Sequence, residues 1–298
     1  MILATRAVVY RMDGDQPDEV YRNGRVRAID QANDTIAIVS NDGLTIVGPE
    51  SASHPLKEAE RVESVAILDT GRTLIGSEGP HIYAFENGEV GRLESIDRLE
   101  CREDFYTPWG GPAAVMSFAH TEDGWVYADI HVGSVLRSQD RGESWEPVTP
   151  DLHEDVHQVA TIPGQPDTVY ANTAGAVYIS EDRGDSWSHR SDGLCYSYGR
   201  AIAVHPDNGD CLLATVSQGP HGSVDGRLYR SDDRGRSWSH VTSGFPDSSE
   251  QNIDTFQIAF TEDGRAWAAV DQELYVSEDH GVSWTVHWTA PEPIKRIA

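Results

Sequence analysis

Four copies of one eight-residue pattern place the strongest constraint on how this chain folds. The pattern is S-x-D-x-G-x-S-W, and it occurs at Ser138–Trp145, Ser180–Trp187, Ser231–Trp238 and Ser277–Trp284. Successive tryptophans of these octets are 42, 51 and 46 residues apart. A repeat of this period indicates an array of similar supersecondary units, because one such unit cannot bury its apolar face alone.

Each octet has the composition of a turn between two strands. Its Asp carboxylate can accept hydrogen bonds from the backbone N–H groups that follow it, and its Gly can adopt the positive φ of a tight turn. Its Trp is placed to bury its ring where the next strand begins. One carboxylate per octet supplies too few oxygens for calcium. We therefore predict a structural role for Asp140, Gly142, Trp145, Asp182, Gly184, Trp187, Asp233, Gly235, Trp238, Asp279, Gly281 and Trp284.

Three short apolar segments precede each octet, and together with the segment after it they predict a four-stranded antiparallel meander. Residues 200–204, 212–216 and 227–230 are one such set. Two units without an octet lie between residues 25 and 85, and we see no long amphipathic helix. The two ends of the chain, residues 1–24 and 292–298, resemble the missing parts of one further unit.

These units predict an all-β fold, a seven-bladed β-propeller of four-stranded antiparallel blades in a single domain over residues 1–298. Seven units give about 43 residues per blade, which is within the propeller range. The last blade is shared between residues 1–24 and 292–298, so N-terminal strands pair with a C-terminal strand. Such closure removes the exposed edges that an open array would leave.

The charge of the chain excludes two classes of partner. It has 49 Asp and Glu against 23 Lys and Arg, for a formal net charge of −26. A field this negative repels nucleic acids and anionic membrane surfaces, so we expect neither as a partner. High acidity with only two lysines, Lys57 and Lys295, is typical of halophilic archaea, in which molar salt screens the self-repulsion.

Nothing in the sequence indicates export or membrane insertion, and we expect a cytoplasmic protein. No run of about 18 apolar residues occurs, and the N-terminus lacks the features of a signal peptide. The three cysteines, Cys101, Cys195 and Cys211, have no metal-ligand spacing, and we interpret them as small buried hydrophobes.

The octets resemble those of the Asp-box, or BNR-repeat, propellers, most specifically over residues 113–288. Members of that group include sialidases, xyloglucan-cleaving glycosidases, sortilin-type receptors and photosystem II assembly factors of the Ycf48 type. The chain is most similar to single-domain prokaryotic proteins described as sialidase-like or WD40/YVTN/BNR-like. The resemblance implies the propeller, whereas it implies no activity, because propellers carry many chemistries. The Arg-Ile-Pro motif of sialidases is absent.

A functional site is expected on the face opposite the octets, which we call the funnel mouth. It collects the loops before each first strand and the loops between second and third strands, and rigid scaffolds present function on such loops. The aromatic and polar residues predicted there as ligand-binding are Trp109, His131, His157, Tyr196, Tyr198, Asn252 and Asp254. Asp129, Asp155, Asp254 and Arg200 are the catalytic candidates, and His131, His157 and His221 are candidate metal ligands.

The leading hypothesis is a binding or scaffold module that uses the funnel mouth to hold a protein partner or a glycan. It requires no cofactor. One alternative is a sialidase-like glycoside hydrolase, which needs two carboxylates about 5–10 Å apart in one pocket. A further alternative is a metal-binding protein in which the mouth histidines hold a divalent metal, since neutral imidazole is a suitable ligand.

Overall fold

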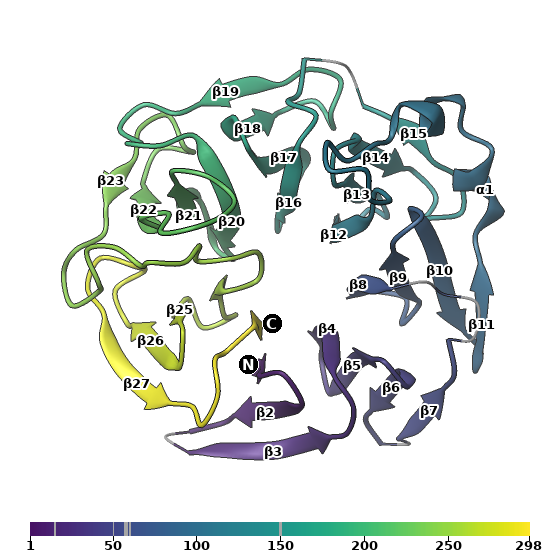
Figure 1. Ribbon diagram of the computed structural model, residues 1–298, viewed down its shortest axis with the longest axis horizontal. Coiled ribbons are helices and arrows are strands. Elements are labelled where there is room, and N and C mark those ends of the chain that lie inside the picture. Colours follow the sequence, from purple (N-terminus) through teal and green to yellow (C-terminus); the bar gives the residue numbers. More distant parts are fainter. Residues whose placement is uncertain (15, 50, 57–58, 60, 149–150) are drawn as a thin grey trace. The chain divides into compact units, whose positions relative to one another are not determined.

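The fold is a seven-bladed β-propeller of four-stranded sheets, as the repeats predict (Figure 1). The computed structural model describes residues 1–14, 16–49, 51–56, 59, 61–148 and 151–298. The chain divides into two compact units, Met1–Val148 with Ala298, and Thr149–Ile297. We keep the assignment of residues 1–298 to one domain as a prediction.

The first unit holds the strands of the shared blade and three complete blades. The shared blade contains β1 (Ile2–Ala4), β2 (Val8–Met12) and β3 (Pro17–Arg22). The next blade is β4 (Val26–Ala32), β5 (Thr35–Ser40), β6 (Gly43–Val47) and β7 (Ala52–His54), followed by β8 (Val62–Ile67), β9 (Thr73–Ser77), β10 (His81–Glu86) and β11 (Glu89–Arg92). After the short helices α1 (Glu94–Asp97) and η1 (Glu100–Asp104) come β12 (Val115–His120), β13 (Val126–Ile130), β14 (Ser134–Ser138) and β15 (Glu146–Pro147).

The second unit holds three blades and the closing strand. These blades are β16 (Val156–Ile162), β17 (Gln165–Thr173), β18 (Ala176–Ser180) and β19 (Ser188–Arg190); β20 (Tyr198–His205), β21 (Asn208–Ser217), β22 (Arg227–Ser231) and β23 (Ser239–His240); and β24 (Ile258–Phe260), β25 (Ala266–Val270), β26 (Glu273–Ser277) and β27 (Thr285–Thr289). The closing strand β28 (Arg296–Ile297) occupies the edge of the first sheet beside β1. Ala298 and Ile2 exchange two backbone hydrogen bonds there, of 2.7 and 3.0 Å.

The four octets form the turns between third and fourth strands, and their hydrogen bonds follow one scheme. In the first octet the Asp140 carboxylate accepts from the backbone N–H of Ser144 at 2.8 Å and from its hydroxyl at 2.5 Å. The Ser138 hydroxyl donates to the same carboxylate at 2.8 Å. Arg141 and Gly142 both have positive φ, of 58° and 86°, so a β-carbon is strained at either position. Burial alone would raise the Asp140 pKa, but the bonds from Ser144 and Ser138 hold it below its usual value.

Three of the octet tryptophans, Trp145, Trp238 and Trp284, bury their rings in apolar clusters that join neighbouring blades within a unit. Trp145 packs with Leu74 and Ile82 of one blade and Leu136 of the next in the first unit. Trp238 has the same place in the second unit, among Tyr170 and Leu212. The turn and the core are therefore built from the same eight residues.

The prediction that all three cysteines are buried is wrong for two of them. Cys211 is buried, Cys101 is partly buried and Cys195 is exposed. Cys195 precedes the first strand of its blade, where the chain lies on the surface. Among the described residues, no helix is long and apolar enough to cross a bilayer.

Candidate functional site

Five of the predicted residues lie in one network at the first strands of three consecutive blades in the second unit. We call Asp155, His157, Tyr198, Arg200 and Asp254 the mouth cluster. Asp155 and His157 stand at the start of β16, Tyr198 and Arg200 at the start of β20, and Asp254 in the loop before β24. The strand order of a propeller blade puts these starts on the face opposite the octets, so residues up to 99 positions apart meet there.

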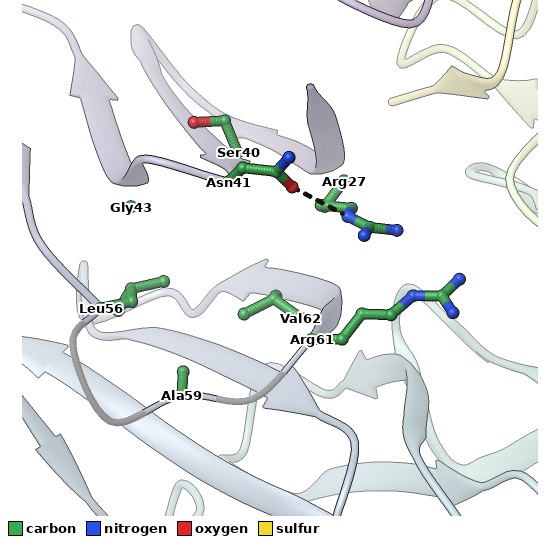
Figure 2. Close-up of a pocket in the computed structure, with 8 residues that line it drawn as sticks. All are labelled: Arg27, Ser40, Asn41, Gly43, Leu56, Ala59, Arg61 and Val62. Atoms are coloured by element: carbon green, nitrogen blue, oxygen red, sulfur yellow. Dashed lines mark hydrogen bonds between the residues drawn. The ribbon is translucent and has the colours of Figure 1, made fainter. Parts of the chain in front are cut away.

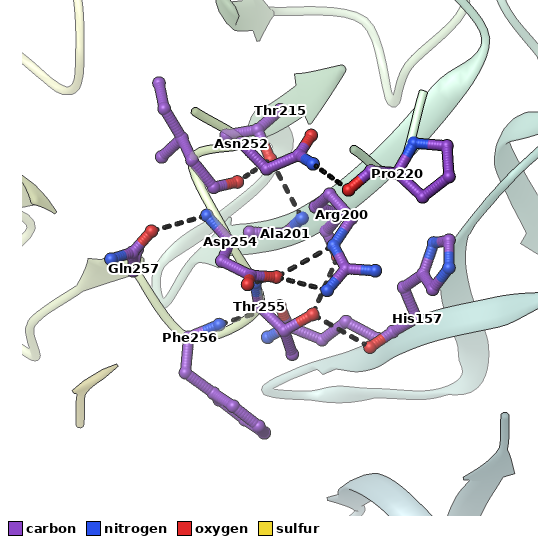
Figure 3. Close-up of polar contacts among 12 residues, drawn as sticks. His157, Arg200, Ala201, Thr215, Pro220, Asn252, Asp254, Thr255, Phe256 and Gln257 are labelled. Atoms are coloured by element: carbon purple, nitrogen blue, oxygen red, sulfur yellow. Dashed lines mark hydrogen bonds and ion pairs between the residues drawn. The ribbon is translucent and has the colours of Figure 1, made fainter. Parts of the chain in front are cut away.

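An ion pair between Arg200 and Asp254 forms the core of the mouth cluster. Arg200 Nε and Nη2 both donate to Asp254 Oδ1, at 2.8 and 2.5 Å, and Figure 3 shows the guanidinium group directed at that carboxylate. Burial alone would raise the Asp254 pKa, but the Arg200 charge and hydrogen bonds reverse this effect and lower it. Burial would likewise lower the Arg200 pKa, and Asp254 reverses that effect. Both groups therefore stay charged through the neutral pH range.

His157 continues the network from Arg200 through Tyr198. Arg200 Nη1 lies 3.4 Å from the Tyr198 hydroxyl, which lies 3.3 Å from His157 Nε2. His157 Nδ1 is 2.6 Å from the Gly199 carbonyl oxygen, so this nitrogen carries the proton and Nε2 accepts from Tyr198. Burial lowers the His157 pKa, with Asp155 opposing the shift, and the imidazole is therefore neutral at pH 7.

Asp155 and His157 are the residues of the mouth cluster that could hold a metal. Asp155 Oδ1 lies 3.3 Å from His157 Nε2. With ligand distances of about 2.1 Å, a cation bound to both atoms would see them at an angle of about 100°, near tetrahedral. The predicted metal set contains His157 together with His131, which belongs to the first unit, and His221, which is exposed on the β21–β22 loop. That set stays a prediction.

β-Bulges present two side chains of the mouth cluster, His157 and Arg200. The pairing of β16 with β17 shifts register between Val156 and Gln158, at His157. The pairing of β20 with β21 shifts between Gly199 and Ile202, at Arg200. A bulge inserts a residue that has no direct partner on the next strand and re-aims its side chain, which explains why these two side chains leave the alternation of their strands.

Sequence analysis missed three polar side chains that support the mouth cluster. Gln158 Oε1 accepts from the Ile202 and Phe256 N–H groups at 3.3 and 3.4 Å. Gln257 Oε1 accepts from the Asp254 N–H at 2.5 Å, and the Thr255 hydroxyl donates to the His157 carbonyl oxygen at 3.2 Å (Figure 3). The signal was present, because Gln158 and Gln257 are polar residues at the apolar start of a first strand.

Tyr196 and Asn252 lie in the second unit but make other contacts. The Tyr196 hydroxyl donates to Asp225 Oδ2 at 2.5 Å and accepts from Gln218 at 3.0 Å. Asn252 Nδ2 donates to the carbonyl oxygens of Gly219 and Pro220, at 3.2 and 3.5 Å. Tyr196 also lines an open groove of about 530 Å³ with Cys195 and His189, away from Arg200.

The remaining predicted residues belong to the first unit. Trp109 is 67 % exposed, and its ring centroid lies 5.4 Å from that of His131. Asp129 was expected in a loop at the mouth, and that position is wrong. It lies within β13, is fully buried, and accepts from the Ser117 hydroxyl on β12 at 2.5 Å. The carboxylate is thereby part of the blade interior.

Comparisons with known proteins identify the fold but do not assign the chain to a family. A family model described as Sortilin-Vps10, sortilin, neurotensin receptor 3, matches residues 133–247, which is less than half of the chain. A search of curated proteins finds no significant match.

Solved structures give the fold. An ancestral GH74 enzyme is similar with a TM-score of 0.67 and 16 % identity over 97 % of this chain, which spans only 40 % of that protein. YCF48 from Cyanidioschyzon merolae is similar with a TM-score of 0.63 and 17 % identity, over 89 % of this chain and 86 % of that one. A structure of YCF48 bound to D1 peptide has a TM-score of 0.54 and 15 % identity, over 87 % and 71 %. The neighbours of this fold thus include both an enzyme and a peptide binder.

Proposed function

We propose that the chain is a binding module whose mouth cluster takes up a cationic segment of a partner protein. The observation that carries the proposal is a charged and accessible carboxylate at Asp254. Its side chain is 49 % exposed, and Arg200 lowers its pKa, so that the carboxylate is available to a cation. Arg200 and the Thr255 N–H engage Oδ1. A Lys or Arg side chain of the partner would donate to Oδ2.

The charge of the chain supports a cationic partner. A formal net charge of −26 attracts basic segments and raises their association rate, and the attraction weakens with salt. The fixed contacts of Arg200, Tyr198 and His157 pre-organise the surface, which lowers the entropy lost on binding. The similarity to YCF48, which in one structure has a bound peptide, supports a protein partner over a glycan.

Asp254 does not provide the acid that the hydrolase alternative requires. A glycosidase needs one carboxyl group with a raised pKa as its acid. Burial alone would raise the pKa of Asp254, but the charge and hydrogen bonds of Arg200 outweigh this effect and lower it. A group in that state does not deliver a proton near neutral pH.

The test uses a fluorescein-labelled hexapeptide of alternating Gly and Lys, with an alternating Gly and Glu peptide for comparison. Anisotropy titrations in 0.15 M KCl compare the wild type with Asp254→Asn and Asp247→Asn. Asp247 is the matched control, because its side chain is 79 % exposed and removing its charge changes the net charge equally. We expect the basic peptide to bind, and Asp254→Asn to weaken it about tenfold, since a hydrogen bond between charged groups is lost.

Asp247→Asn should weaken binding less than about twofold, as for a distant charge in screened solution. Equal losses in both variants would mean that the overall field attracts the peptide, and the mouth cluster would be excluded as its site. Failure of the wild type to bind the basic peptide would also overturn the proposal.

A divalent metal is the second candidate ligand, and the 3.3 Å separation of Asp155 Oδ1 and His157 Nε2 favours it. Zinc chloride should raise the melting temperature of the wild type, because a ligand that binds only the folded state stabilises it. His157→Gln should abolish that rise, whereas His221→Gln, at an exposed loop position, should keep it. An equal rise in wild type and His157→Gln would exclude this pair as the site.

A further inference from the structure

A small cavity in the first unit has a cationic rim and an apolar wall. It measures about 280 Å³ and lies where the start of β4 and the β5–β6 turn face the segment before β8. Arg27, Asn41 and Arg61 contribute polar groups to it, and Leu56, Ala59 and Val62 contribute apolar ones. Figure 2 shows the guanidinium groups of Arg27 and Arg61 extending to the same side of this cavity.

Arg27 has no carboxylate partner among the described residues, which sets it apart from most arginines of this acidic chain. Its Nε donates to Asn41 Oδ1 at 3.2 Å, and its two Nη groups remain for a ligand. Arg61 is already paired, with Glu63 at 2.5 Å and Glu78 at 3.3 Å. Among the residues that the structure describes, the Nη groups of Arg27 are therefore the guanidinium fork available to a ligand in this cavity.

Charged groups of both signs surround Arg27 among the described residues. Burial lowers its pKa first, and the charges of Arg61 and Arg25 lower it further, outranking the opposite effects of Glu63 and Glu78. An anion bound beside Arg27 would relieve the repulsion between these guanidinium groups.

We propose that this cavity binds a small organic monocarboxylate, with the carboxylate on the Nη edge of Arg27 and the apolar body against Leu56, Ala59 and Val62. A guanidinium fork matches the two oxygens of a carboxylate. A single guanidinium fork matches a monoanion better than a dianion such as phosphate. A volume of about 280 Å³ is at the lower end of ligand pockets, so the body is short.

A β-bulge supports this assignment by its position. The pairing of β4 with β5 shifts register between Val26 and Ala28, at Arg27. The same irregularity presents His157 and Arg200 in the second unit. Arg27 therefore leaves the strand alternation at the place where other blades present their charged mouth residues.

The test measures hexanoate binding by isothermal titration calorimetry on the full chain, with hexanamide and inorganic phosphate as comparison ligands. The variants are Arg27→Gln, Arg27→Lys and Arg236→Gln. Arg236 is exposed in an octet of the second unit and is the matched control for the loss of one positive charge. Circular dichroism and the melting temperature of each variant show that it is folded.

We expect the wild type to bind hexanoate at least tenfold more tightly than hexanamide or phosphate. Arg27→Gln should bind hexanoate at least tenfold more weakly than the wild type, because a hydrogen bond between charged groups is lost. The affinity of Arg27→Lys for hexanoate should lie between those of the wild type and Arg27→Gln, because lysine keeps the charge but not the guanidinium fork. Arg236→Gln should bind hexanoate as tightly as the wild type does. Equal binding of hexanoate and hexanamide, unchanged binding in folded Arg27→Gln, or no binding of hexanoate at 20 mM, roughly the limit of weak affinity, would each overturn the proposal.

Discussion

The carboxyl group of Asp30 gives a quantitative test of how blades are joined in the first unit. Asp30 lies on β4, and its Oδ2 accepts from the Ile67 N–H of β8, in the next blade, at 2.6 Å. Burial raises the pKa of Asp30 from 3.8 to about 6, although hydrogen bonds from the Ile67 and Gln31 backbone oppose the shift. The folded state therefore binds a proton at Asp30 more tightly than the unfolded state does.

A carboxyl group with a raised pKa stabilises the fold most when it is protonated. That contribution is complete below about pH 4 and is lost as the pH rises through about 6. At about 1.4 kcal/mol per pKa unit, the shift is worth about 3 kcal/mol. This is an upper limit, because the side chain keeps some contact with solvent. Asp30→Asn keeps an oxygen for the Ile67 N–H and removes the charge.

We expect Asp30→Asn to be more stable than the wild type by up to about 3 kcal/mol at pH 8 and equally stable at pH 4. Urea denaturation at several pH values measures the difference in free energy of unfolding. Asp34→Asn, at an exposed position of the same blade, is the control and should show no such dependence. A difference between Asp30→Asn and wild type that stays constant from pH 4 to pH 8 would refute the reasoning.

Three further predictions concern the second unit. Asp182→Ala removes the acceptor of three hydrogen bonds, of 2.8, 2.8 and 2.6 Å, inside its octet, and should lower the free energy of unfolding by about 1–3 kcal/mol in urea denaturation. A double-mutant cycle of Arg200→Gln and Asp254→Asn should give a coupling of about 1 kcal/mol in the same assay, and additive effects would contradict the ion pair. Tyr196→Phe should raise the pKa of Asp225 from about 2, because the Tyr196 hydroxyl is the main cause of its low value, and carbon NMR of the carboxyl group measures it.

The sequence was sufficient for the fold because the determinants of each blade are local. In an octet such as Ser180–Trp187, the acceptor carboxylate, the positive-φ glycine and the buried tryptophan lie within eight residues. The turn that these three residues form can therefore be predicted without knowledge of any distant segment. The number of repeats then predicts the number of blades. The apolar C-terminal end of the chain supplies the strand that pairs with β1.

The five residues of the mouth cluster were predicted from the sequence, whereas Arg27 was missed, because it leaves the alternation on which sequence analysis relies. Every first strand from β4 to β20 shifts register near its start, at Arg27, Glu63, Met116, His157 and Arg200. Alternation correctly indicates which side chains of a regular strand are buried, but one inserted residue exchanges the two faces. Arg27 was missed for this reason. Asp129 was misplaced for the opposite reason: β13 continues regularly through it, so a charged residue that looked like part of a loop faces Ser117 inside the blade. The bulges thus explain how Arg27, His157 and Arg200 are presented, and why Arg27 was missed by a pattern-based prediction.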